Sequence, residues 1–360
     1  MKAAVCREHG APLVIEDLLV DPPRHEEVCV RIRACAICHS DIAALRGDWG
    51  EYDLPMVVGH EAAGVVDAVG PGVNDFAPGD SVAVTLVRSC GRCRACLAGH
   101  TVSCTGDIAL DRETRLRTHD GQPVIQGLRA GAFAEYCVVH KSQIVKIPRD
   151  VPPVSAALLG CAVITGYGSV TRVAQIREGS TVVVVGTGGV GLNAVQGAVA
   201  GGAAAVIAVD INSSKLAAAA SLGATSVINA AETDATQAVL ELTGNEGADY
   251  VLVAVGHRPS IENGITMLNR FGVMVLMGMP ASDDRILRLD AHELTAGRSI
   301  LGSKMGDTCI TEDIPGLVSL YQSGRLKLDE LVSNTYPLDG INQAIAAAQT
   351  GDALRNVITF

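Results

Sequence analysis

The sequence predicts an α/β protein of two domains, the first rich in β-strands and the second built on a doubly wound parallel sheet. The chain has 360 residues, more than one hydrophobic core usually supports. Short apolar segments cut by Gly, Pro and Asp dominate residues 1–160, a pattern typical of strands and turns. From Thr181 onward, apolar strands alternate with alanine-rich stretches of helical length, which indicates parallel βαβ units.

Individual segments carry these patterns in chain order. In the first half, VCVRIRACAI at 28–37 and GVVDAVGPGV at 64–73 are predicted to be strands and turns. In the second half, the strands TVVVVG and AVIAVD alternate with the helical stretches VGLNAVQGAVAGG and SSKLAAAASLG, and YVLVAVG and GVMVLMGM continue the series. The final segment, LRNVITF, alternates as a strand does, and we expect it to rejoin the first domain.

Composition and charge restrict the partners of the protein. Hydrophobic residues make up 48% of the chain and charged residues 19%, which is typical of a folded globular protein. The formal net charge is -11 and basic residues are not clustered, so nucleic acid and anionic membrane surfaces are excluded as natural partners. Charged residues interrupt the N-terminal segment before a signal-peptide core can form, and the apolar run 181–185 is far too short to span a bilayer. We expect a cytoplasmic protein that binds a small molecule.

A glycine motif opens the first βαβ unit of the second half. The segment GTGGVG at 186–191 has the spacing G-x-G-x-x-G between a strand and a helix, and Asp210 follows it by nineteen residues. Such glycines let the backbone approach a pyrophosphate at the helix N-terminus. The acidic residue accepts hydrogen bonds from the adenosine ribose and repels the extra phosphate of NADP, so NAD is the expected cofactor. The expected contacts are Gly186, Gly188, Gly189, Val190, Gly191, Asp210 and Lys215.

Four cysteines are crowded into one segment with little apolar content. They lie within fifteen residues, in SCGRCRACLAGHTVSC, at positions Cys90, Cys93, Cys96 and Cys104. Disulfides are disfavoured because the chain is expected in a reducing compartment. Four thiolates close a tetrahedral shell around zinc and leave no position for substrate, so we expect a structural zinc site that stabilises a segment without a core of its own.

Two further segments contain metal-binding residue types, CHSD beginning at Cys38 and GHEAAG containing His60. Each residue alone is more simply explained as a packed core residue. Together with four other segments, however, they make the sequence resemble the zinc-dependent medium-chain alcohol dehydrogenase family over residues 1–360. The matching segments are CHSD at 38–41, GDW at 47–49, GHEAAG at 59–64, the cysteine segment, GCAVITGYG at 160–168 and GTGGVG at 186–191.

The resemblance implies a fold in which the catalytic domain is discontinuous. It would consist of residues 1–161 and 306–360 around a GroES-like β core, with a Rossmann NAD-binding domain at 162–305 inserted between them. The resemblance also implies that Cys38, His60 and Cys161 bind a catalytic zinc, a ligand set known in alcohol dehydrogenases, with water or substrate in the fourth position. Two zinc ions per chain are therefore expected.

The family mechanism is implied in the same way. The metal lowers the pKa of a bound alcohol so that an alkoxide forms and transfers hydride to the nicotinamide. In this mechanism Ser40 takes the first proton, Asp41 orients His60, and Glu61 lies beside the zinc as an occasional ligand. Two further residues match cofactor contacts: Thr165 beside the nicotinamide and Arg355 on the pyrophosphate.

The sequence departs from the family pattern at two positions. His39 stands where some members carry arginine, so we predict weaker NAD binding and easier product release, because a largely neutral imidazole holds pyrophosphate less firmly than a guanidinium. Ala43 stands where many members carry a relay histidine. The route of the proton beyond Ser40 is therefore not predicted.

Trp49 and Phe133 match positions that line the substrate channel in relatives. Together with Leu86 they make the expected channel apolar and fairly narrow, which favours a primary aliphatic or aryl alcohol or its aldehyde. Two alternatives within the family are a polyol and a hydroxymethyl-thiol adduct, as in formaldehyde dehydrogenases. The second alternative needs cations for a thiol-peptide carboxylate, and the candidates are Arg112, Arg115 and Arg117.

A hypothesis of another class is a non-catalytic relative that binds zinc and nucleotide. The presence of all three catalytic ligands and of Ser40 disfavours it, and disfavours a zinc-free quinone or enoyl reductase as well. The remaining cysteines are interpreted as apolar packing residues: Cys6, Cys29, Cys35, Cys137 and Cys309. Relatives associate through the Rossmann domain, so we expect a homodimer or homotetramer that uses the region 298–303.

Overall fold

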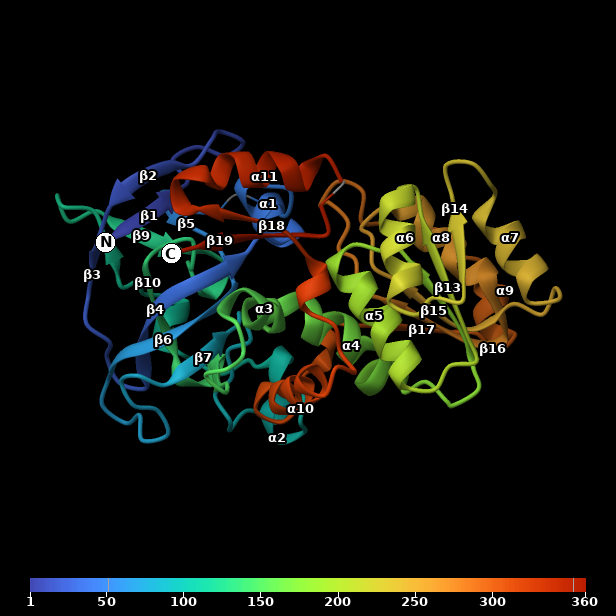
Figure 1. The fold of residues 1–360 in the computed structure, drawn as a ribbon, viewed down its shortest axis with the longest axis horizontal. Coiled ribbons are helices and arrows are strands. Elements are labelled where there is room, and N and C mark those ends of the chain that lie inside the picture. The colour runs from blue at the N-terminus through green and yellow to red at the C-terminus, as the bar shows by residue number, and fades with distance from the viewer. Residues whose placement is uncertain (51, 352) are drawn as a thin grey trace. The chain divides into compact units, whose positions relative to one another are not determined.

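The computed structural model describes residues 1–50, 52–351 and 353–360. The chain divides into two compact units. The β unit comprises Met1–Cys161 and Cys309–Phe360, and the doubly wound unit comprises Ala162–Thr308. The predicted α/β class is confirmed, because one unit is built largely from antiparallel strands and the other is a parallel sheet with helices packed on it (Figure 1).

The main sheet of the β unit has the strand order β11-β7-β6-β4-β19-β18, and β10 also pairs with β4. Its strands are β4 (Glu27–Ala36), β6 (Glu61–Val69), β7 (Ser81–Val84), β10 (Tyr136–His140), β11 (Ile144–Lys146), β18 (Val332–Pro337) and β19 (Arg355–Thr359). In β4 the exposed Arg31 and Arg33 flank the buried Ile32, the alternation of a strand with one face on a core. The C-terminal strand β19 lies between β4 and β18.

Smaller elements complete the β unit. Its other strands are β1 (Lys2–Val5), β2 (Val14–Asp17), β3 (Leu19–Val20), β5 (Met56–Val57), β8 (Leu116–Arg117) and β9 (Pro123–Gln126). Its helices are α1 (His39–Arg46), α2 (Arg94–Leu97), α3 (Pro153–Leu158), α10 (Ile310–Gln322) and α11 (Ile341–Gln349). One apolar core, which includes Val30, Ile32 and Phe133, joins strands of this unit with α1 and α11.

The doubly wound unit is a parallel sheet of order β14-β13-β12-β15-β16-β17. Its strands are β12 (Thr181–Val185), β13 (Ala205–Asp210), β14 (Ser226–Asn229), β15 (Ala248–Val253), β16 (Leu268–Leu276) and β17 (Ser299–Gly302). Its helices are α4 (Ile164–Gly168), α5 (Gly189–Ala200), α6 (Ser213–Ser221), α7 (Ala235–Leu242), α8 (Arg258–Gly264) and α9 (Ala291–Thr295). The order reverses between β12 and β15, and in such sheets ligands bind at the carboxyl ends of the strands beside this reversal.

Among the described residues, one helical run, Pro153–Ala174, is long and apolar enough to cross a membrane. Of its most apolar window, 83% is buried within the protein, as in a helix that belongs to a core. The run contains two π-helical segments, Leu159–Val163 and Ser169–Ala174. Such segments are often found at functional sites.

Gly64 provides a test of the close packing of β6 on β4. A Cβ there would lie 2.3 Å from the Arg31 carbonyl oxygen and 2.8 Å from Val30 Cγ1. We expect Gly64→Ala to destabilise the protein by about 2 kcal/mol, because neither neighbour has room to move. The unfolding midpoint measures this change.

Gly316→Ala is the matched control for this substitution. Gly316 lies on the exposed side of α10, and no atom lies within 4 Å of the position that a Cβ would take there. Alanine at this position should stabilise the helix by about 0.5–1 kcal/mol. A Gly64→Ala protein that unfolds at the wild-type temperature would contradict the packing described.

Candidate active site

A buried cluster of metal-binding side chains lies beyond one end of β4. Ala36, the last residue of β4, pairs with Glu61 of β6 on one side and with Val357 of β19 on the other. This register gathers residues that are far apart in the chain at the same edge of the sheet. The cluster consists of Cys38, His60, Glu61 and Cys161, all buried, and one ligand atom of each lies within 4.8 Å of the others.

Asp41 determines how His60 presents its ring. One Asp41 oxygen, Oδ1, accepts hydrogen bonds from His60 Nδ1 and from the Gly59 amide, both at 2.9 Å. The other, Oδ2, accepts from the Cys38 amide at 3.0 Å, at the first turn of α1. His60 Nε2 is buried and has no hydrogen-bond partner among the described residues. A histidine whose Nδ1 donates to a carboxylate offers Nε2 as a metal ligand.

Cys161 enters the cluster from the π-helical segment Leu159–Val163. The preceding residue, Gly160, packs directly on the sheet: a Cβ would lie 2.4 Å from the Val84 carbonyl oxygen and 3.0 Å from Glu61 Cα. A glycine is therefore required for the helix to approach β6 and β7 closely. This approach brings the Cys161 sulfur within reach of Cys38.

The electrostatics of the cluster favour a bound cation. Cys161, followed by His60, holds the pKa of the Cys38 thiol well below its ordinary value, whereas the same contact with Cys38 raises the pKa of Cys161. Burial opposes a charged imidazole, but the Asp41 carboxylate raises the pKa of His60 well above its ordinary range. Cysteine sulfur and imidazole nitrogen gathered in one buried set are donors that zinc prefers.

The Glu61 carboxyl group pairs with Arg355, a residue that the sequence analysis matched to a contact with the cofactor pyrophosphate. Burial raises the pKa of Glu61 to about 8, and its Oε2 accepts a hydrogen bond from Arg355 Nη2 in a buried ion pair. Glu61 Oε1 and Arg355 Nε have no hydrogen-bond partner among the described residues. Sequence reasoning missed this pair, because its members lie 294 residues apart and only the strand register joins them.

The four-cysteine segment forms a second cluster at the surface of the β unit. One ligand atom from each of Cys90, Cys93, Cys96 and Cys104 lies within 4.8 Å of the others. Backbone amides point at the sulfurs: Cys90 and Gly106 donate to Cys104 Sγ at 3.2 and 3.3 Å. The amide of Cys96 contributes most to lowering the pKa of Cys93, to about 5. These four cysteines form no disulfide among the described residues, so the set is a candidate metal site.

The glycine motif of the doubly wound unit links β12 to α5, which begins at Gly189. Gly186 has φ +86°, and a Cβ there would lie 2.3 Å from Val255 Cγ1. A Cβ on Gly191 would lie 1.8 Å from the Gly186 carbonyl oxygen. A Cβ on Gly188, in contrast, would meet no atom of the described residues within 4 Å. The outer glycines are therefore required by packing, and the middle one faces open space, as a backbone that approaches a pyrophosphate must.

Asp210, at the end of β13, is held by a residue inside the motif. Its Oδ2 accepts hydrogen bonds from the Thr187 amide at 2.7 Å and the Thr187 hydroxyl at 3.0 Å, and its Oδ1 accepts from the Asn212 amide at 3.0 Å. Sequence reasoning did not include Thr187. In the same unit, Lys215 lies half-buried in α6, and the buried Thr165 donates its hydroxyl hydrogen to Met305 Sδ at 3.7 Å.

The first turn of α1 carries the predicted proton acceptor. The Cys38 thiol donates to Ser40 Oγ at 3.5 Å, so this hydroxyl lies beside the metal-binding cluster. His39 is exposed and Ala43 is half-buried. Of the predicted substrate-channel residues, Trp49 and Leu86 are half-buried, whereas Phe133 is fully buried and packs against Gly59.

The arginines considered for a carboxylate-bearing substrate have partners within the β unit. Arg112 pairs with Asp107, and Arg117 pairs with Asp21 at 3.0 Å. Arg115 is buried and binds Glu27 through two hydrogen bonds of 2.5 and 2.7 Å. Each guanidinium is thus already neutralised by a carboxylate.

Both halves of the chain match models of known protein families. Residues 24–149 match the alcohol dehydrogenase GroES-like domain, and residues 189–323 match the zinc-binding dehydrogenase domain. A GroES-like β unit combined with a doubly wound unit and a buried cysteine–histidine cluster defines an oxidoreductase of the medium-chain dehydrogenase class.

Comparison with individual proteins narrows the class. The chain is 36% identical to alcohol dehydrogenase class-2 isozyme 2 of Oryctolagus cuniculus, over all of this chain and 97% of that protein. It is 37% identical to alcohol dehydrogenase B of Mycobacterium tuberculosis, over all of this chain and 98% of that protein. It therefore belongs to the zinc-dependent medium-chain alcohol dehydrogenase family. Among solved structures, benzyl alcohol dehydrogenase from Acinetobacter calcoaceticus superposes with a TM-score of 0.93 at 31% identity, over 100% of this chain and 99% of that one.

Asp41 provides a test of how the buried cluster is oriented. An amide has one acceptor oxygen, whereas both Asp41 oxygens accept hydrogen bonds. We expect Asp41→Asn to weaken zinc binding at this cluster by about 10–100-fold, because His60 would lose its orientation. Competition with a chromogenic chelator measures the affinity.

The control for Asp41→Asn is Asp249→Asn in the doubly wound unit. Asp249 also accepts hydrogen bonds through both oxygens, from the Thr181 amide and the Asn269 side chain, each at 2.8 Å. This substitution should leave zinc affinity unchanged. If Asp41→Asn also bound zinc as tightly as wild type, Asp41 would not be the residue that orients His60.

Proposed function

We propose that this protein is an NAD-dependent, zinc-dependent alcohol dehydrogenase that moves a hydride between a primary alcohol carbon and the cofactor. The single observation that carries the proposal is the buried set of Cys38, His60 and Cys161, in which His60 Nε2 has no hydrogen-bond partner among the described residues. Membership of the family supports the same reaction class.

The donor set fits a catalytic zinc. Cys38, His60 and Cys161 would hold it, with Glu61 beside them, and the four-cysteine cluster would hold a second, structural zinc. When bound, the catalytic ion supplies Lewis-acid chemistry that polarises an alcohol or carbonyl oxygen. Asp41 keeps the proton on His60 Nδ1 and so maintains the ligand tautomer. Ser40, whose hydroxyl lies beside Cys38, accepts the proton that leaves the substrate.

The cofactor would bind the glycine motif of the doubly wound unit. The open space beside Gly188 and the N-terminus of α5 suit a pyrophosphate. Asp210 favours NAD over NADP through its negative charge, and Oδ1 accepts one hydrogen bond within the protein and retains capacity for a ribose hydroxyl. We also propose Lys215, Thr165 and Arg355 as cofactor contacts; the Nε–H of Arg355 has no hydrogen-bond partner among the described residues.

A primary aliphatic or aryl alcohol is the substrate best supported. The residues expected at the channel, Trp49, Leu86 and Phe133, are apolar, and one superposable relative is named a benzyl alcohol dehydrogenase. The hydroxymethyl-thiol alternative loses support, because Arg112, Arg115 and Arg117 are paired with carboxylates of the β unit.

The organisation of the protein follows from the same proposal. The β unit would be the catalytic domain and the doubly wound unit the NAD-binding domain. We propose a cytoplasmic homodimer or homotetramer in which the region 298–303, which includes the edge strand β17, contributes to association.

The first experiment measures zinc per chain together with NAD reduction. We expect two zinc ions per chain, and turnover of benzyl alcohol and short primary alcohols in preference to a polyol or a hydroxymethyl-thiol adduct. Cys38→Ala should retain one zinc and lose activity by a factor of at least about 10³, because a ligand of the catalytic ion is gone.

The matched variant is Cys29→Ala, which removes a buried cysteine of β4 outside both clusters. It should keep two zinc ions and wild-type turnover. Zinc content that is the same in Cys38→Ala and wild type would overturn the catalytic assignment, and two zinc ions without turnover would favour the non-catalytic relative.

His39 provides a separate test of the cofactor proposal. We expect His39→Arg to lower the dissociation constant of NADH about 5–10-fold, because a guanidinium pairs with pyrophosphate more strongly than an imidazole. NADH fluorescence titration measures this. His119→Arg, at an exposed position in the β unit, adds the same charge elsewhere and should have no effect; equal affinities in both variants would refute the role of His39.

A further inference from the structure

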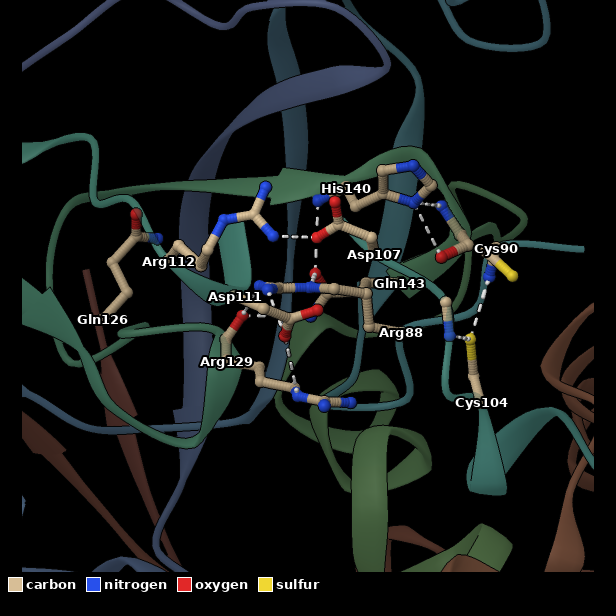
Figure 2. A network of polar contacts seen from close by, with 12 residues as sticks. Arg88, Cys90, Cys104, Asp107, Asp111, Arg112, Gln126, Arg129, His140 and Gln143 are labelled. Carbon is tan, nitrogen blue, oxygen red and sulfur yellow. Dashed lines mark hydrogen bonds and ion pairs between the residues drawn. The ribbon is translucent and has the colours of Figure 1, made fainter. Parts of the chain in front are cut away.

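A buried arginine outside the metal-binding cluster lies at the centre of a polar network (Figure 2). Arg88 is 2% exposed, and each of its three nitrogens donates a hydrogen bond. Nε donates to Gln143 Oε1 at 2.7 Å, Nη1 to Asp111 Oδ1 at 3.0 Å, and Nη2 to the Arg129 carbonyl oxygen at 2.9 Å. Burial lowers the pKa of Arg88 to about 10, so the guanidinium remains charged at neutral pH.

The network converges on one carbonyl group. Gln143, fully buried, donates from Nε2 to the Arg129 oxygen at 3.0 Å and to the Thr85 oxygen at 2.9 Å. The Arg129 oxygen thus accepts from Arg88 and Gln143 together. Asp111 pairs with Arg88 at 3.0 Å and with Arg129 Nε at 3.3 Å, which neutralises the buried guanidinium.

The accepting carbonyl belongs to a backbone segment in a sparsely populated conformation. We call residues 127–131 the 127–131 loop. Leu128 has φ +49° and Arg129 has φ +63°, values that L-residues other than glycine rarely adopt. Such conformations persist where the surrounding structure determines them. Arg88 and Gln143 bind the Arg129 oxygen, and Gln126 Nε2 binds the Ala130 oxygen at 3.1 Å.

The 127–131 loop leads directly to the side of the metal-binding cluster. The Ala132 amide donates to the Gly59 oxygen and the Phe133 amide to the Val58 oxygen, both at 2.9 Å. A Cβ on Gly59 would lie 2.6 Å from Phe133 N and 2.9 Å from the Phe133 ring. The segments that contain Gly59 and Phe133 are therefore in close contact. Gly59 immediately precedes His60 and donates its amide hydrogen to Asp41.

We propose that Arg88 is a positioning residue for substrate binding: by holding the Arg129 carbonyl, it sets the path of the 127–131 loop and thereby the place of Phe133 beside Gly59 and His60. The proposal rests on the proposed function, in which His60 binds the catalytic zinc; Phe133 is fully buried and would act on the substrate wall through the Gly59 segment against which it packs. Arg88 itself touches neither substrate nor metal ligands, and acts through the loop.

A second buried arginine, Arg115, provides a control that distinguishes a positioning role of Arg88 from a purely stabilising one. Arg115 is 1% exposed and donates to Glu27, Glu113 and the Thr114 oxygen. None of these acceptors belongs to the 127–131 loop or to the metal-binding cluster. Removing either guanidinium takes a charged donor away from acceptors that it binds inside the protein, so both substitutions cost stability. Only the loss of Arg88 should alter the substrate wall.

The experiment compares Arg88→Met, Arg88→Lys and Arg115→Met in the zinc-loaded enzyme. For Arg88→Met we expect the KM for benzyl alcohol to rise at least about fivefold with kcat changed less than about twofold, because the substrate wall moves and the metal ligands stay in place. Arg88→Lys should give an intermediate KM, because one ammonium group cannot reach all three acceptors of the guanidinium. Arg115→Met should lower Tm and leave KM unchanged.

A second readout does not depend on activity. Hydrogen exchange of the peptide that covers residues 127–133, followed by mass spectrometry, should be faster in Arg88→Met than in wild type and unchanged in Arg115→Met. If wild type turns over no alcohol but this difference is found, the proposed function fails and the control of the loop by Arg88 stands.

The proposal is overturned if Arg88→Met keeps the wild-type KM and the wild-type exchange of residues 127–133. It is also overturned if Arg115→Met changes KM as much as Arg88→Met does, since loss of stability alone would then account for the effect. If Arg88→Met does not fold, Arg88→Lys decides: an unchanged KM and unchanged exchange contradict the proposal, and increases in both support it.

Discussion

A charged group buried in a protein needs a partner of opposite charge close by, and this constraint determines which elements surround the buried cluster of the β unit. Two cysteines, a histidine and a glutamate are buried within 4.8 Å of one another, and an uncompensated charge among them would cost several kcal/mol. Each neighbouring element supplies part of the compensation. Asp41 of α1 binds His60, Arg355 of β19 binds Glu61, and the donor set suits a divalent cation. The position of β19 between β4 and β18 is therefore as important to the site as the ligands themselves.

The candidate sites of the two units are built by different means. In the β unit, side chains of several elements converge, so their positions depend on strand register and on polar contacts such as those of Asp41 and Arg88. In the doubly wound unit, the candidate cofactor site is formed largely by backbone: Gly188 leaves open space among the described residues, while Thr187 holds the Asp210 carboxylate through two hydrogen bonds.

The features that the sequence predicted are those with local spacing. The motif G-x-G-x-x-G and the four cysteines each lie within one short segment, and the resemblance to the dehydrogenase family rested on such segments. The fold class was predicted from strand and helix periodicity and is confirmed. The pairing of Glu61 with Arg355 and of Arg88 with the Arg129 oxygen was not predicted, because both depend on strand register or loop path. Arg112, Arg115 and Arg117 were considered for substrate, and no pattern in the sequence indicated their carboxylate partners.

The distance in sequence between Glu61 and Arg355 also orders events during synthesis. A ribosome that adds roughly 5–20 residues per second needs about 15–60 s to make the 294 residues between them. Throughout that interval Cys38 and Glu61 have already been made, while the guanidinium that balances Glu61 has not. The nascent chain thus contains all four residues of the buried cluster long before the cation that balances Glu61, and the surroundings of Glu61 are completed only when β19 is inserted beside β4.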